Sequence, residues 1–182
     1  MGLIEDLSPK CKRWCEAIAT EQRSLLDLRA FDCLPAYELA THLNATILTP
    51  EQLFTLEQQH LEVLLTSDGW SAAVICQYPL QIVHNPRHAI ARRESNLMHE
   101  FGHLLLKHQM IGFDPKTGLP LRCLQDEKEA TYLGGCLQIP HRGLLWAVQR
   151  EMTLPQIAEH FGASEEMVLF RSNAAGIRQS VK

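Results

Sequence analysis

Residues 97–108 read LMHEFGHLLLKH, and this stretch decides how the sequence is interpreted. It contains the pattern HExxH, in which His99 and His103 are four positions apart and Glu100 follows the first histidine. On an α-helix, residues i and i+4 lie above one another on the same face, which allows both imidazoles to reach one ion. Zinc accepts imidazole nitrogens at about 2.0–2.1 Å. The stretch therefore predicts a helix that carries two zinc ligands.

Glu100 is predicted to act on water and not to bind the metal. It lies roughly 100° around the predicted helix from His99, within hydrogen-bonding reach of a water on the metal. Zinc lowers the pKa of such a water to about 7, and a carboxylate can take its proton as the water attacks a carbonyl. The alternative is a core helix with two satisfied histidines, but these polar groups are costly to bury without a purpose.

A third ligand is expected on a second helix, where DEKEATYLGGC (126–136) offers Asp126, Glu127 and Glu129. Glu127 and Glu129 are two positions apart and point to nearly opposite sides of a helix. Small residues continue the Glu127 side and would let the two helices approach closely: Ala130, Thr131 and Gly134. Gly102, which costs about 1 kcal/mol in a helix, is explained if another backbone packs against it. Glu127 is therefore preferred, although all three acids could be a solvated first turn.

The composition is that of an ordinary globular domain, with 182 residues of which 46% are hydrophobic and 21% charged. The net charge of −4 provides no basic field for nucleic acid or anionic membranes. The N-terminal residues do not resemble a signal peptide, and no apolar run is as long as a membrane span. We therefore expect a cytoplasmic protein with no membrane partner. Its six cysteines are expected to be reduced, although Cys11 and Cys15 could share a metal.

Apolar spacing and turn residues predict a mainly helical chain with one β-hairpin. Helices are expected at 10–30, 34–43, 49–67, 92–108, 126–140 and 142–152, followed by two short helices. The hairpin is expected at 69–85 and a loop at 112–121. We expect one domain over 1–182, with N-terminal helices at 1–67, a catalytic core at 68–140 and C-terminal helices at 141–182.

At these motifs the sequence resembles the ImmA/IrrE family of metallo-endopeptidases. The second helix of that family follows roughly E-x-x-A-(N/D/H)-x-F-A, then an apolar pair and a proline. EKEATYLGGCLQIP is similar to it at Glu127, Ala130, Leu133, Gly134 and Pro140. The resemblance covers about residues 34–175, and Asn85 and Arg92 occupy the places of an asparagine and an arginine ahead of the metal helix. The chain departs from the pattern at Thr131 and, within the apolar pair, at Gln138.

The resemblance implies an α+β, zincin-like fold with a small antiparallel sheet, surrounding helices and a C-terminal helical hairpin. It implies a zinc endopeptidase that holds one Zn²⁺ through His99, His103 and Glu127, with Glu100 as general base. It also implies a protein substrate, a transcriptional repressor or regulator. Thr131 can hydrogen-bond a ligand histidine but brings no charge. A zinc-binding sensor without efficient hydrolysis therefore remains an alternative.

Residues 154–173, LPQIAEHFGASEEMVLFRSN, resemble a helix-turn-helix, with Ser164 as the cap of the second helix. A DNA-binding regulator is therefore a further alternative. The second helix begins with Glu165 and Glu166 and has Arg171 as its basic residue, which suits a recognition helix poorly. We expect a helical hairpin that packs on the rest of the chain and binds no nucleic acid.

Other polar residues receive no role from the sequence. His108, five positions after His103, is expected at the surface. Candidates for stabilising an oxyanion are present but unassigned: His88, His141, Arg142 and Tyr132.

Overall fold

The structure of the chain, a computed structural model, describes residues 7–53, 70–109, 111–113 and 120–177. Most of the helix predicted at 49–67 lies outside these residues, and only a short 3-10 turn, η1 (Pro50–Gln52), is seen at its start. Within the described ranges, no helix combines the length and apolar character that crossing a membrane requires.

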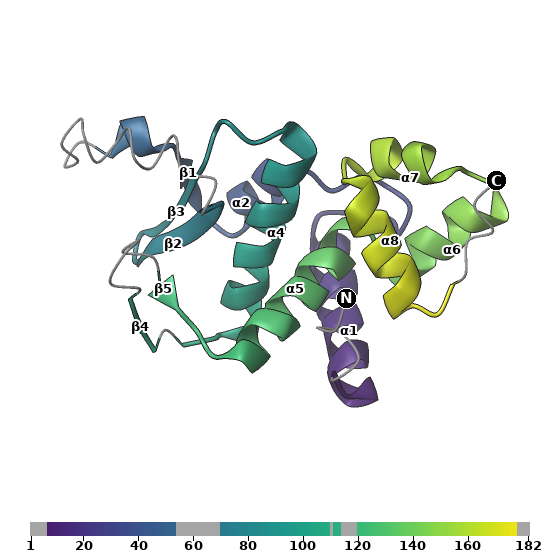
Figure 1. Cartoon of the computed structure of the whole chain (residues 1–182), viewed down its shortest axis with the longest axis horizontal. Helices are drawn as coiled ribbons and strands as arrows, with labels where there is room; N and C mark the ends of the chain where they lie inside the picture. The colour runs from purple at the N-terminus through teal and green to yellow at the C-terminus, as the bar shows by residue number, and fades with distance from the viewer. Residues whose placement is uncertain (1–6, 54–69, 110, 114–119, 178–182) are drawn as a thin grey trace.

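The described chain forms seven α-helices and two small sheets. The helices are α1 (Pro9–Leu25), α2 (Ala36–His42), α4 (Ile90–Leu106), α5 (Leu124–Gln138), α6 (His141–Gln149), α7 (Leu154–Phe161) and α8 (Glu165–Ala174). The strands are β1 (Thr46–Leu48), β2 (Ala72–Gln77), β3 (Leu80–His84), β4 (Gly112–Phe113) and β5 (Pro120–Leu121). Figure 1 shows the larger sheet at one end, α4 and α5 in the middle and α6 to α8 at the other end. The predicted α+β class is confirmed.

The larger sheet has three strands in the order β1-β3-β2. The predicted hairpin is present as the antiparallel pair β2–β3, joined through Tyr78 and Pro79. The expectation of a purely antiparallel sheet was incomplete, because β1 pairs in parallel with β3. This strand was not predicted, because three residues are too few for a recognisable alternation. The stretch predicted as a loop contains a second pair, β4–β5.

The helix bounds differ from the predicted ones where the backbone turns left-handed. α1 ends at Leu25, five positions before its predicted end, and Asp27 follows with a φ of 56°. α4 ends at Leu106 because Lys107 adopts a φ of 57°. His108 therefore lies beyond the helix that was predicted to include it.

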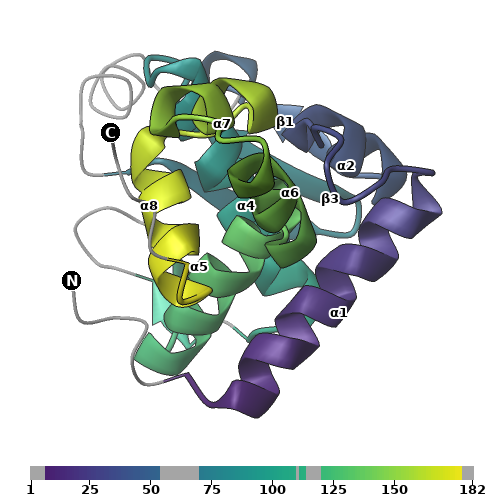
Figure 2. The ribbon, with the colours of Figure 1, turned by 90° about the vertical axis from the view of Figure 1, so that its right-hand side faces the viewer.

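The main core lies between α4 and α5, and α1 packs along α5 (Figure 2). Its fully buried residues on these two helices include Leu97, Met98, Phe101, Leu133 and Leu137. A second apolar cluster joins the C-terminal helices α6, α7 and α8. The contact between α4 and α5 is the one that positions the predicted metal ligands.

Two buried arginines fix the C-terminal end of α5. Arg23 donates from Nη2 to the carbonyl oxygens of Leu137 and Gln138 at 2.9 and 3.1 Å. Arg171 donates from Nε to the carbonyl oxygen of Ile139 at 2.8 Å. Carbonyls at a helix C-terminus lack partners within the helix, and these bonds satisfy them. The side chain that looked like a departure, Gln138, is buried and bonds both Ser95 and the carbonyl of Gly162.

The C-terminal hairpin formed by α7 and α8 has the expected cap. The side chain of Ser164 accepts a hydrogen bond from the backbone N–H of Met167 at 3.1 Å. Arg171, the basic residue of the helix-turn-helix-like segment, is fully buried and pairs with Glu16 of α1. Its guanidinium is therefore not available to a DNA phosphate.

Candidate metal centre

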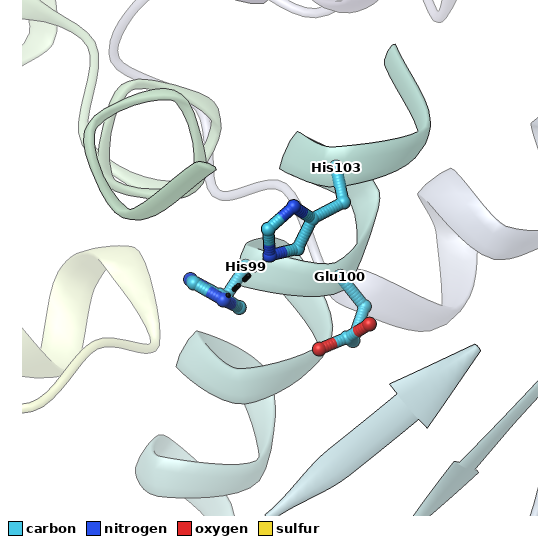
Figure 3. A group of neighbouring side chains, drawn as sticks. All are labelled: His99, Glu100 and His103. Carbon is cyan, nitrogen blue, oxygen red and sulfur yellow. Dashed lines mark hydrogen bonds between the residues drawn. The ribbon is translucent and has the colours of Figure 1, made fainter. Parts of the chain in front are cut away.

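His99 and His103 lie on the face of α4 that is turned toward α5. Their Nε2 atoms are 3.0 Å apart, and their rings meet edge to face with centroids 4.6 Å apart. Figure 3 shows the two imidazoles together on one side of the helix. The spacing of four residues thus brings both nitrogens to one point, as the helical period requires.

The carboxylate of Glu127 on α5 completes this cluster. Its Oε2 lies 3.1 Å from Nε2 of His99, and its Oε1 lies 3.4 Å from Nε2 of His103. Donor atoms of a tetrahedral zinc with bonds of about 2.0–2.1 Å are separated by about 3.3 Å. The three side chains therefore fit one zinc ion. Glu129 points elsewhere, with Oε2 at 3.5 Å from Nε2 of His108.

Thr131 determines which nitrogen of His99 carries the proton. Its hydroxyl donates to the carbonyl oxygen of Glu127 at 2.8 Å, and the same Oγ1 lies 3.3 Å from Nδ1 of His99. Since the hydroxyl proton is used on the carbonyl, Oγ1 accepts from an Nδ1–H of His99. The lone pair of His99 is then on Nε2, the atom that faces the other donors.

The protonation states also suit a metal ion. Burial lowers the pKa of His103 to about 4, which keeps its imidazole neutral near pH 7. Hydrogen bonds with the imidazoles of His103 and His99 hold the pKa of Glu127 well below its usual range. Neutral imidazole and ionised carboxylate are the forms that bind metals.

Glu100 lies beside the cluster and is turned toward strand β2 (Figure 3). One ligand atom from each of His99, Glu100 and His103 lies within 4.8 Å of the others. The Oε2 atom of Glu100 accepts a hydrogen bond from the backbone N–H of Val74 at 3.3 Å. Burial raises the pKa of Glu100, whereas His99, Arg122 and the N–H of Val74 lower it. The carboxylate is thus held at the edge of the site, between α4 and the sheet.

Arg122 is a site residue that the sequence interpretation missed. Its Nη1 lies 3.9 Å from Oε2 of Glu100, and its side chain is only 7% exposed. It comes directly after β5 and two residues before α5 begins. Its spacing from the HExxH motif does not indicate this contact. The contact depends on the path of the chain between α4 and α5.

A cavity of about 970 Å³ opens beside the cluster. It is lined by β2 and its turn, by the C-terminal end of α4, and by Arg122 and His103. The side chains of His99 and Glu127 are 27% and 42% exposed. The cluster is therefore accessible from solvent on the Glu127 side, as a catalytic metal with an open position requires.

The remaining sequence candidates lie elsewhere. Asn85 is buried after β3 and accepts a hydrogen bond from the N–H of Arg87 at 3.0 Å, whereas Arg92 is exposed on α4. The lining of the cavity does not include the four unassigned oxyanion candidates, His88, His141, Arg142 and Tyr132. The prediction that His108 lies at the surface was wrong, because its side chain is only 7% exposed. It folds back against His103 after the turn at Lys107.

The chain has a match among known protein families. A peptidase family described as the IrrE N-terminal-like domain matches residues 56–173, well over half of the chain. The matched residues include α4 and α5 with all the donor atoms described above. No curated protein and no solved structure matches the chain. The match indicates an activity of the metallopeptidase type, and the chain belongs to the peptidase family of the IrrE N-terminal-like domain.

Proposed function

We propose that this protein is a zinc-dependent endopeptidase in which His99, His103 and Glu127 hold one Zn²⁺. The observation that carries the proposal is the convergence of the three donors, whose separations of 3.0, 3.1 and 3.4 Å match a tetrahedral zinc site. The partly exposed side chains of His99 and Glu127 leave room for water or a substrate carbonyl.

Glu100 is the general base in this proposal. Zinc, when bound, would polarise the scissile carbonyl and acidify the attacking water. Glu100 takes a proton from that water as its oxygen attacks the carbonyl carbon, and it passes the proton to the leaving amine nitrogen as the C–N bond breaks. Burial raises the pKa of Glu100 and makes its carboxylate a stronger base. The N–H of Val74 and the guanidinium of Arg122 keep the carboxylate in place.

The cavity supports a peptide as substrate. Among the described strands, β2 is at the edge of its sheet and also lines the cavity. An extended peptide can pair with such an edge through main-chain hydrogen bonds. Ile75 and Tyr78, on β2 and in its turn, expose apolar surface at this edge. We propose a repressor or regulator protein as the substrate, on the basis of the family resemblance.

Glu100→Gln tests the proposal. A base acts on water and not on the metal, and we therefore expect this variant to fold and to keep its zinc. Cleavage of a regulator encoded beside this protein, co-expressed and followed on a gel, should fall about 10²–10⁴-fold. Glu159→Gln, which changes an exposed glutamate on α7, is the matched control and should cleave normally.

Each other outcome has a distinct meaning. If zinc-loaded Glu100→Gln cleaves at the wild-type rate, Glu100 is not the general base. Loss of zinc in that variant would make Glu100 a structural residue. If the zinc-loaded wild type cleaves nothing and Glu100→Gln does not change what the protein signals, the alternative of a zinc-binding sensor without efficient hydrolysis would be favoured.

A further inference from the structure

His108 is brought back to the metal cluster by the turn that ends α4. Lys107 has left-handed backbone angles, φ 57° and ψ 38°, and the N–H of His108 donates to the carbonyl oxygen of His103 at 3.0 Å. Such a turn reverses the chain at a helix C-terminus. As a result His108 packs beside His103 with centroids 5.1 Å apart, and its side chain is only 7% exposed.

The two rings meet through their Nδ1 atoms. Nδ1 of His103 lies 3.0 Å from Nδ1 of His108. On its other side, Nε2 of His108 faces two carboxylates of α5, Oε2 of Glu129 at 3.5 Å and Oδ1 of Asp126 at 3.9 Å. These contacts run in series from His103 through His108 to the acidic first turns of α5.

If His103 binds a metal, the protons along these contacts can be assigned in only one direction, from His103 toward His108. Nε2 of His103 faces His99 and Glu127, and a metal there requires its lone pair. Its proton is then on Nδ1 and is donated to Nδ1 of His108. The second ring then carries its own proton on Nε2, the atom that faces the two carboxylates. The opposite direction would place a proton on Nε2 of His103 and prevent it from binding metal.

We propose that His108, held by Glu129 and Asp126, is a positioning residue that fixes His103 as a zinc ligand. The inference rests on the zinc site of the proposed function. Ligand histidines commonly donate their outer N–H to an acceptor that fixes ring orientation and tautomer. Thr131 accepts from His99 and His108 accepts from His103, so that each ligand histidine has its own partner. In this proposal Glu129 is not a zinc ligand, but it helps to hold His108 in place.

The test separates the hydrogen bond from the volume of the ring. In His108→Phe the ring remains but the acceptor is lost. In His108→Asn the ring is lost, but the side-chain oxygen takes nearly the place of Nδ1. The zinc dissociation constant of the full chain is measured by competition with a chromophoric chelator, and urea unfolding of the metal-free protein reports stability. His42→Phe, on α2, is the control histidine.

We expect His108→Phe to bind zinc roughly 10–100-fold more weakly, the usual cost of removing such a partner. His108→Asn should bind more tightly than His108→Phe, even though it disturbs packing more. An Asp126→Asn, Glu129→Gln double variant should weaken zinc binding by a smaller factor, since amide oxygens still accept. These changes in zinc affinity should not follow the stability of the metal-free protein.

Two results overturn the inference. One is a zinc affinity in His108→Phe equal to that of wild type. The other is equal weakening in the Phe and Asn variants, in proportion to lost stability, which would show a purely structural role. If His108→Phe does not fold, the Asn and double variants decide alone. Wild-type zinc affinity in the double variant would exclude a role of the two carboxylates in holding His108. Wild-type protein that takes up no zinc would overturn the proposed function as well.

Discussion

Gly102 of α4 packs directly against the backbone of Ala130 of α5. A Cβ atom on Gly102 would lie 2.6 Å from the carbonyl oxygen of Ala130. A Cβ atom on Gly134 would lie 2.9 Å from the carbonyl oxygen of Met98. The helices therefore meet at two points where a glycine of one helix lies directly against the backbone of the other. This close approach is what lets Glu127 reach the histidines of α4, and it confirms the expectation that a backbone packs on Gly102.

Gly102→Ala should separate the two helices and weaken zinc binding. Alanine favours the helix by about 1 kcal/mol, but overpacking against a rigid backbone costs about 1–3 kcal/mol and moves Glu127 away from the imidazoles. Zinc affinity and urea unfolding of the metal-free protein measure the two effects. Adding Ala130→Gly should not rescue the variant, because the obstacle is the main chain of Ala130. Normal zinc affinity in Gly102→Ala would show that the spacing of the helices is not critical.

Glu127→Ala should abolish stoichiometric zinc binding, whereas Glu129→Ala should still bind one ion. Of these two glutamates, Glu127 has carboxylate oxygens 3.1 and 3.4 Å from the two imidazoles, whereas Glu129 faces His108. Elemental analysis of zinc-loaded, desalted protein distinguishes the two variants. The reverse pattern would identify Glu129 as the third ligand.

Thr131→Val should weaken zinc binding by about tenfold without unfolding the protein. Valine keeps the shape of threonine but cannot accept from Nδ1 of His99, which loses its 3.3 Å contact. Thr131→Asp, which adds a charge at the position where the family pattern has a polar residue, should bind zinc at least as tightly as wild type. Chelator competition measures both. Unchanged affinity in Thr131→Val would mean that the hydroxyl does not orient the imidazole.

Alkaline pH should destabilise the fold through Tyr132. Burial raises the pKa of this phenol to about 12, and its ring lies against the guanidinium of Arg171. The unfolded chain ionises at about pH 10, and the native state keeps the neutral phenol. The stability contributed by Tyr132 is therefore complete below about pH 10 and is lost as the pH rises through about 12. Burial raises the pKa of Cys15 and Cys136 in the same direction.

Tyr132→Phe isolates this effect, since phenylalanine keeps the ring and does not titrate. Between about pH 9 and about pH 12, wild type should lose on the order of 1–2 kcal/mol more than the variant. Urea unfolding at the two pH values gives the difference. Parallel losses in both proteins would assign the alkaline transition to the buried thiols.

The face of α4 that carries both histidines was determined by the sequence itself. Its two histidines come together through the helical period, which depends only on local backbone geometry. The preference for Glu127 over Glu129 was also local, because the small residues on its side of α5 indicate which face approaches another helix. Strand β1 was missed because three residues carry too little pattern, and its pairing with β3 joins distant parts of the chain.

Only the tertiary structure placed Arg122 and His108. The contact of Arg122 with Glu100 depends on the path of the chain between α4 and α5, and no spacing in the sequence encodes that path. His108 was assigned to the surface because the helical pattern was continued through Lys107. A lysine in the left-handed region carries no sequence signal of the kind that glycine would give. The inner donors of this site are thus set by helical geometry, whereas the residues that hold them are set by the turns that end the helices.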